Sequence, residues 1–249
     1  MVRACVRFMS APRRFFVYNV DWPSGEACID GEEFIHAKTV LRVEEGAEII
    51  LLDGSGKEYS AIVAKIEKHR LVAHITGVAE GDREPKENIY LLCGALKGDK
   101  TEFVVQKATE LGVQKIGVFS SEYCSAYMNE NKLERLKKVA REAAKQCLRS
   151  RAPEIEYFGD LKSALQSAKD YKNKIFACEF LKESKIDISV ISGSVALVVG
   201  SEGGFSEKEF AQSKEEGFSG ITLGKRILRA ETAAVALCSL AAFSLGELR

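Results

Sequence analysis

The stretch VALVVGSEGGFSEKEF, residues 195–210, joins an apolar, β-branched run to a bend that is rich in glycine. The run predicts a buried strand, and helix-forming sequence resumes after Ser206. Gly200, Gly203 and Gly204 indicate a bend that a ligand can approach closely, because glycine carries no Cβ. In open α/β sheets, ligands bind beyond the carboxyl ends of the strands. The bend is therefore either a ligand site or a plain strand-to-helix turn, and this stretch alone favours neither.

The spacing of the glycines excludes two familiar nucleotide-binding motifs. A Rossmann motif requires G-x-G-x-x-G, whereas this bend reads G-x-x-G-G. A P-loop also fails further along the chain, because Arg226 follows Gly224-Lys225 where that motif needs Ser or Thr.

A second stretch, ITLGKRILRAETAAVAL at residues 221–237, places charges directly before an apolar helix. A short predicted strand ends at Gly224, and Lys225, Arg226 and Arg229 follow it. Glu231 stands near the start of the helix, where a carboxylate interacts favourably with the helix dipole. Glu231 could simply cap that helix, but two arginines and a glutamate beside so apolar a segment favour a functional loop.

The chain of 249 residues divides into two regions of different pattern. Short β-branched runs fill the first region, and the turn DGSG at residues 53–56 predicts a hairpin. The polar segment at residues 79–87 is typical of a linker, and strands then alternate with helices. We expect an α/β fold with a small N-terminal β-barrel at residues 1–82 and a parallel sheet, covered by helices on both faces, at residues 83–249.

Several helix boundaries in the second region can be predicted. Asp99 and Glu102 are spaced as a capping box, and so are Ser206 and Glu209. Asp160 predicts the start of a short helix. A longer helix is expected over residues 132–150.

Charge and cysteine content limit the possible partners. Lysine plus arginine and aspartate plus glutamate number 36 each, so a nucleic-acid partner would have to be bound by local basic patches. The seven cysteines form no C-x-x-C pair and the three histidines show no metal-ligand spacing, so we expect reduced thiols, no metal and a cytoplasmic protein. The longest apolar segment, residues 232–245, is too short to span a bilayer, and no membrane association is expected. A helix that is apolar on all sides must be shielded from water on all sides. One sheet face covers only part of it, so a second subunit is expected to cover the rest, which favours a homodimer.

Two basic zones are candidates for RNA contact. The segment 132–151 holds eight Lys or Arg and two Glu, and a helical wheel places Arg135, Lys138, Arg141, Lys145 and Arg149 on one arc. The first 20 residues add Arg3, Arg7, Arg13 and Arg14 with no acidic residue before Asp21. A solvated surface explains one basic helix equally well. Phe15 and Phe16 could stack on a base, although barrel-core phenylalanines are commoner.

Together, VVGSEGGFSEKE and LGKRILRAETA resemble the paired C-terminal motifs of the RsmE family. These are SPOUT-class, trefoil-knotted methyltransferases that form N3-methyluridine in small-subunit (16S) ribosomal RNA. GALKGDKTEFVVQKATELGV and EAAKQCLRSRAP match the central motifs of the family, and RRFFV with HAKTVLRVEEGAEIILLDGSG matches its N-terminal barrel. Ser201 stands where the family usually has proline, and residues 1–12 form an extension.

The resemblance implies a knotted SPOUT-type sheet, a PUA-like barrel that binds RNA, S-adenosylmethionine as cofactor, and a homodimer with a shared active site. Its implied partner is ribosomal RNA or the small ribosomal subunit. The implied cofactor-binding residues are Val199, Gly200, Glu202, Gly203, Leu223, Gly224, Ile227, Leu228 and, from a neighbouring strand, Glu179.

Catalysis would need the proton on uracil N3 to leave, so a cation near the uracil oxygens would stabilise the anion. Arg229 and Arg226 are the candidates for that cation, and Glu231 is either the general base or the residue that orients Arg229. The residues expected to contact RNA are Arg13, Arg14, Arg141, Lys145 and Arg149. Two alternatives stay open: a SPOUT methyltransferase that acts on another RNA such as transfer RNA, and a non-catalytic RNA-binding relative.

Overall fold

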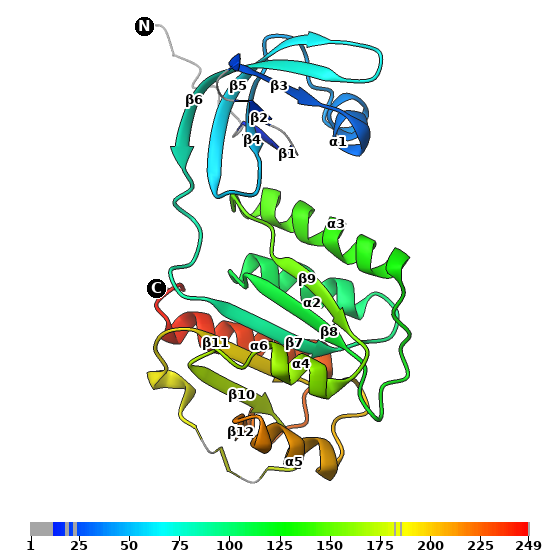
Figure 1. The fold of residues 1–249 in the computed structure, drawn as a ribbon, viewed down its shortest axis with the longest axis vertical. Helices are drawn as coiled ribbons and strands as arrows, with labels where there is room; N and C mark the ends of the chain where they lie inside the picture. The colour runs from blue at the N-terminus through cyan, green and yellow to red at the C-terminus, as the bar shows by residue number, and fades with distance from the viewer. Residues whose placement is uncertain (1–11, 18–19, 22–23, 182, 185, 249) are drawn as a thin grey trace, which may run out of the picture. The chain divides into compact units, whose positions relative to one another are not determined.

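The computed structural model describes residues 12–17, 20–21, 24–181, 183–184 and 186–248. These residues form two compact units, with the division between Arg83 and Glu84 (Figure 1). Most of the N-terminal extension, with Arg3 and Arg7, lies outside the described residues.

The N-terminal unit is built on a curled six-stranded sheet. β1 pairs in parallel with β4, and the other pairs are antiparallel. The strand order is β1-β4-β5-β6-β3-β2. The strands are β1 (Arg13–Phe16), β2 (Val20–Asp21), β3 (Glu26–Ile29), β4 (Glu48–Leu52), β5 (Lys57–Ile66) and β6 (Leu71–Glu80). The hairpin predicted around residues 53–56 is confirmed as β4 and β5, which agrees with the expected small β-domain.

One helical segment interrupts this sheet and covers its core. α1 (Gly31–Ile35) continues into a π-helix (His36–Val40). Phe34 of α1 and Phe15 of β1 are both buried in the same apolar cluster. Phe15 is therefore a core residue, as the commoner interpretation of that phenylalanine held.

The C-terminal unit contains a six-stranded sheet in which every pair of strands is parallel. Its order is β12-β10-β11-β7-β8-β9. The strands are β7 (Ile89–Gly94), β8 (Lys115–Phe119), β9 (Glu154–Phe158), β10 (Asn173–Ala177), β11 (Val195–Val199) and β12 (Ser219–Ile221). The helices are α2 (Lys100–Glu110), α3 (Glu130–Gln146), α4 (Leu161–Ser167), α5 (Glu207–Glu215) and α6 (Ala230–Ser244), with a 3₁₀ turn at Ile188–Val190.

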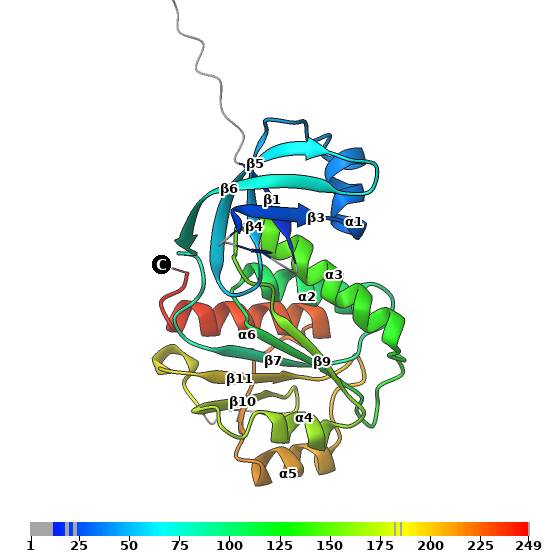
Figure 2. The same ribbon diagram turned by 45° about the horizontal axis from the view of Figure 1, so that its top comes forward.

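Alternate residues of the central strand β7 face opposite layers, as a strand period of two requires. Leu91 packs in the cluster that contains α2, α3 and α6, whereas Tyr90 packs in the cluster that contains α4 and α5 (Figure 2). Every residue of β7 and β11 is buried. The predicted parallel sheet with helices on both faces is confirmed, and the knot that the resemblance implies stays a prediction.

Helix caps explain most of the boundaries. The capping box of Ser206 and Glu209 is confirmed, and Asp160 caps α4 through the backbone N–H of Ser163. The box predicted at Asp99 is wrong. Asp99 has φ −93° and ψ 3° instead of extended backbone, and its side chain caps nothing. Glu102 forms an ion pair with Arg135 of α3 at 2.8 Å instead.

The long basic helix starts and ends earlier than expected. Asn129 accepts a hydrogen bond from the backbone N–H of Lys132, so α3 begins at Glu130. It ends at Gln146, and Leu148 then adopts a left-handed conformation with φ +65°. Within the described parts of the chain, no helix is long and apolar enough to cross a membrane.

Candidate functional site

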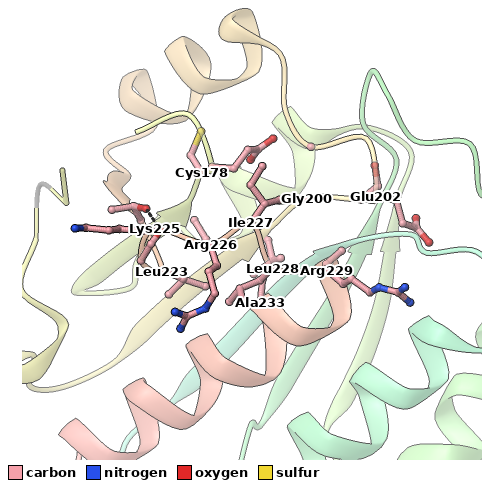
Figure 3. A pocket seen from close by; sticks show the side chains of 18 of the residues that line it. Cys178, Gly200, Glu202, Leu223, Lys225, Arg226, Ile227, Leu228, Arg229 and Ala233 are labelled. Carbon is pink, nitrogen blue, oxygen red and sulfur yellow. Dashed lines mark hydrogen bonds between the residues drawn. The ribbon is translucent and has the colours of Figure 1, made fainter. Parts of the chain in front are cut away.

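A cavity of about 430 Å³ lies at the carboxyl ends of β10, β11 and β12 in the C-terminal unit (Figure 3). This volume falls in the range of about 300–1,000 Å³ typical of small-molecule sites. Both C-terminal motifs contribute to its lining, as does the end of β10. Eight of the nine residues expected at the cofactor site line it: Glu179, Val199, Gly200, Glu202, Leu223, Gly224, Ile227 and Leu228.

The glycine bend is packed tightly from the protein side. A Cβ on Gly200 would lie 3.0 Å from the Phe205 ring, and a Cβ on Gly204 would collide with the Glu179 carboxylate. Gly204 also has φ +69°, a left-handed conformation that favours glycine. A Cβ on Gly94, at the end of β7, would lie 2.5 Å from the backbone nitrogen of Ser201. The bend is thus a fixed wall of the cavity.

Gly203 is the exception among the expected cofactor residues, because it is not part of the cavity lining. A Cβ at this position would lie 2.6 Å from both the carbonyl oxygen and the Cβ of Tyr123. A side chain on Gly203 would therefore collide with Tyr123 instead of extending into the cavity. Close packing against the segment between β8 and α3 requires glycine here.

Glu202 is bound to the start of α2. Its Oε1 accepts hydrogen bonds from the backbone N–H of Lys97 and from Lys100 Nζ, both at 3.1 Å. Burial opposes ionisation, but hydrogen bonds from the backbone of Glu202 and Lys97 and from Lys100 hold the pKa of this carboxyl below its ordinary value. Glu202 is therefore an anion at neutral pH.

Glu231 does not line the cavity, although Ala230 and Ala233 beside it do, and it lies between two cations. Its Oε2 is 3.8 Å from Lys100 Nζ, and its Oε1 is 4.0 Å from Arg229 Nη1. The Glu231 side chain is 15% exposed, and its Oε2 is buried without a hydrogen bond. The side chain of Arg229, by contrast, is 80% exposed. The structure thus brings Arg229 and Glu231 together, as their proximity in sequence suggested.

Arg226 also lines the cavity and is exposed. In Figure 3 its guanidinium group and that of Arg229 point in different directions. The two arginines therefore do not form a single cationic cluster.

The polar cavity residues that sequence reasoning missed include Lys100, Cys178, Ser201 and Thr222. Burial raises the pKa of the Cys178 thiol to about 11, so this thiol is neutral at physiological pH. The segment around Lys100 matched a family motif as a whole, but nothing in the sequence linked Lys100 to Glu202, which lies 102 residues further on. Cys178 directly precedes Glu179 at the end of a predicted strand, and that position was its only signal.

The expected cationic stripe on α3 is shorter than the helical wheel predicted. Arg135 and Lys138 are exposed and Arg141 is partly exposed. Lys145 is buried and forms an ion pair with Glu142 at 2.7 Å, so its expected exposure is wrong. Arg149 is 3% exposed and lies beyond the end of α3, where the helical spacing no longer applies.

The two arginines at the start of β1 also differ in how far their side chains are exposed. Arg13 is exposed. Arg14 donates two hydrogen bonds to Glu58, at 2.6 and 3.1 Å, and only 10% of its side chain is exposed. Arg14 therefore stabilises the sheet, and the expectation of an available cation at this position is wrong.

Across the described portion of the sequence, no three His, Cys, Asp or Glu residues are placed to hold a metal ion. Glu202 of the cavity is instead paired with Lys100, and the neighbouring Glu231 with Lys100 and Arg229.

Comparison with known proteins gives consistent matches along the chain. Residues 82–242 match the family model described as an RNA methyltransferase domain, and residues 29–76 match the RNA methyltransferase PUA domain. The ribosomal RNA small subunit methyltransferase E of Bacillus subtilis is 32% identical over 219 residues, covering 82% of this chain and 85% of that protein. The protein of that name from Mesomycoplasma hyopneumoniae is 37% identical over 168 residues, covering 66% and 74%.

Two solved structures have the same fold as this chain over nearly the whole length of both proteins. One is the ribosomal RNA small subunit methyltransferase E of Neisseria gonorrhoeae bound to S-adenosylmethionine, with TM-score 0.84 and 32% identity, covering 94% of this chain and 98% of that one. The other is a methyltransferase from Legionella pneumophila with bound S-adenosylmethionine, with TM-score 0.86 and 28% identity over the same shares.

Proposed function

This chain belongs to the ribosomal RNA small subunit methyltransferase E family, and we propose that it methylates N3 of a uridine in small-subunit (16S) ribosomal RNA. The methyl donor is S-adenosylmethionine, the ligand bound in two similar structures. The observation that carries the proposal is that the two separate C-terminal motifs line one cavity of suitable size.

The cavity offers the groups that such a cofactor requires. Residues 199–202 and 204 of the bend line one wall, and residues 222–228 line another. A Cβ on Gly224 would meet nothing within 4 Å, so the glycine leaves its polar backbone open to a ligand. Glu179 provides one carboxylate at the end of β10. When bound, S-adenosylmethionine supplies an electrophilic methyl group on a sulfonium.

Side chains of the protein stabilise the negative charge that forms on the uracil and assist removal of its N3 proton. The exposed guanidinium of Arg229 stabilises negative charge on the uracil oxygens, and Arg226 is the second candidate for this role. Glu231 either accepts the N3 proton or orients Arg229. Its 4.0 Å contact with Arg229 and the burial of its Oε2 support the orienting role.

RNA binding is assigned to residues 1–82 and to the exposed part of α3, and methyl transfer to residues 83–249. The match of residues 29–76 to an RNA methyltransferase PUA domain supports the first assignment. Arg13 and Arg141 stay candidates for phosphate contact. Arg14, Lys145 and Arg149 are withdrawn from this role, because their side chains are bonded within the protein and largely buried.

The enzyme acts as a two-fold symmetric homodimer in the cytoplasm. α6 is not covered on all sides: Leu240 is 42% and Phe243 is 56% exposed, and Ile227 before the helix is 87% exposed. An apolar groove beside α6 continues this surface and shares Leu223 and Leu228 with the cavity. A second copy would cover these side chains. A cytoplasmic location fits the ribosomal substrate and the six free cysteines within the described residues.

The test combines cofactor binding with product analysis. The purified protein is titrated with S-adenosylmethionine by calorimetry, then incubated with the cofactor and either small ribosomal subunits from a strain lacking the enzyme or transfer RNA. Mass spectrometry of nucleosides should detect N3-methyluridine in the ribosomal RNA alone. Methylation of transfer RNA would assign a different substrate, and absence of cofactor binding would indicate a non-catalytic relative.

A further inference from the structure

The ammonium group of Lys100 lies between two carboxylates that come from different parts of the chain. Its Nζ is 3.1 Å from Glu202 Oε1 and 3.8 Å from Glu231 Oε2. Lys100 begins α2, Glu202 lies in the bend after β11, and Glu231 lies in the first turn of α6. One side chain therefore links three segments that surround the cavity.

The position of Lys100 in its own helix is electrostatically unfavourable. The N-terminus of a helix carries partial positive charge and favours anions over cations. Lys100 is nevertheless the first residue of α2, and Glu202 lies close enough to accept a hydrogen bond from Lys97 just before the helix. The two carboxylates offset the cost of a cation at this helix end.

Glu231 depends on Lys100 more than Glu202 does. Glu202 also accepts a backbone hydrogen bond, whereas Glu231 Oε2 is buried without any hydrogen bond. The other cation near Glu231, Arg229, is 80% exposed and therefore well screened by solvent. A buried carboxylate oxygen without a hydrogen bond is costly unless a charge compensates it.

We propose that Lys100 is a positioning residue for methyl transfer, which holds Glu231 together with Glu202 and so keeps Glu231 oriented toward Arg229. The inference rests on the proposed function, since Glu231 and Arg229 are the groups assigned to proton and charge handling. It adds a residue that the C-terminal motifs do not contain.

Charged groups from several segments lie around Glu231. Lys100 comes from α2, Glu202 from the bend after β11, and Arg229 from the N-terminal end of α6 itself. Cys93 of β7 is electrostatically coupled to both glutamates, but burial raises the pKa of its thiol to about 12 and leaves it neutral. Removing Lys100 would therefore leave two carboxylates with Arg229 as the remaining cation of this group.

The test compares kcat and KM in the wild type, Lys100→Met, Lys100→Arg and Lys107→Met. Lys107 is a matched control, because it lies on the same helix, pairs with Glu110 and has a side-chain exposure of 33% against 32% for Lys100. In Lys100→Met kcat should fall by about tenfold or more while KM changes less, since misplacement of a reacting group can cost up to about 100-fold in rate. Lys100→Arg should restore much of the wild-type kcat, and Lys107→Met should match the wild type.

A readout that does not depend on activity accompanies these rates. Carbon NMR at neutral pH records the chemical shift of the Glu231 carboxyl, with Glu231→Gln used to assign its signal. This signal should move in Lys100→Met and stay in place in Lys107→Met, because of these two lysines only Lys100 contacts the Glu231 carboxylate. An unchanged Glu231 signal in Lys100→Met, or an unchanged kcat, would overturn the proposal. A wild-type enzyme that methylates no ribosomal RNA would refute the proposed function instead, and the NMR signal would still decide whether Lys100 positions Glu231.

Discussion

Arg149 donates hydrogen bonds through Nε and Nη2 to Glu84 Oε2, at 3.1 and 2.8 Å, in the buried part of the C-terminal unit. Its Nη1 donates to the carbonyl oxygens of Thr109 and Val113, which end α2 and precede β8. Glu84 Oε1 in turn accepts the backbone N–H groups of Ser150 and Arg151. This pair fastens the first residue of the unit to the turn after α3.

We expect Arg149→Met to lower the free energy of unfolding by about 3–5 kcal/mol, because removing one partner of a buried ion pair leaves the other charge uncompensated. Arg135→Met is the control. Arg135 also pairs with a glutamate, but its side chain is 67% exposed, and exposed pairs contribute less than about 1 kcal/mol. Urea denaturation measures both, and equal losses would contradict the structural role of Arg149.

The case of Arg149 shows where the sequence stops being informative. The parallel sheet and its two layers of helices were predictable, since buried runs such as VALVV alternate with capped helices. A helical wheel, however, assumes that the helix continues, and nothing in CLRSR signals that Leu148 turns left-handed. Exposure of Arg149 was therefore predicted from a periodicity that had already ended.

In the candidate site, too, local features were predictable from the sequence and tertiary contacts were not. Most of the cavity lining was predictable because each motif is contiguous in sequence. The ion-pair partners of Glu202 and Glu231 were not predictable. Lys100 contacts both carboxylates only because the strand order of the folded sheet brings distant segments together. The packing of Gly203 against Tyr123 is likewise a tertiary contact with no local signal.

Gly203→Val should destabilise the fold by roughly 1–3 kcal/mol, as overpacking of a tight contact does. The new Cβ would meet the backbone oxygen of Tyr123, which cannot move as a flexible side chain can. Gly159→Ala is the matched control, because a Cβ there would meet nothing within 4 Å. Thermal unfolding followed by circular dichroism measures both. If Gly203→Val kept its wild-type stability but lost cofactor binding, the ligand interpretation of Gly203 would be restored.

The stability conferred by Glu202 should depend on pH in a defined direction. Its pKa is lower in the folded protein than the ordinary value of 4.5, so its contribution is present above that value and is lost as the pH falls through the folded pKa. Glu202→Gln should therefore be less stable than the wild type at pH 7, and the difference should shrink at pH 4 and below. Urea midpoints at a series of pH values measure this. Glu215→Gln, an exposed position at the end of α5, is the control and should run parallel to the wild type. A gap between Glu202→Gln and the wild type that stays constant with pH would contradict the assigned hydrogen bonds.

The exposed side of α6 provides the last prediction, which concerns assembly. Leu240 lies on this helix and lines the apolar groove that adjoins the cavity. Leu240→Glu would place a charge in the proposed dimer interface and should weaken dimerisation by roughly 30-fold or more, which corresponds to about 2 kcal/mol. Phe103→Glu is the matched control, because Phe103 on α2 is 45% exposed against 42% for Leu240. Light scattering at micromolar concentration should give a dimer for the wild type and Phe103→Glu, and a monomer for Leu240→Glu. Methylation should fall with the dimer, although Leu240 has no chemical role, because the shared site would be incomplete. A wild-type protein that is monomeric and fully active would rule out both the dimer and the shared site.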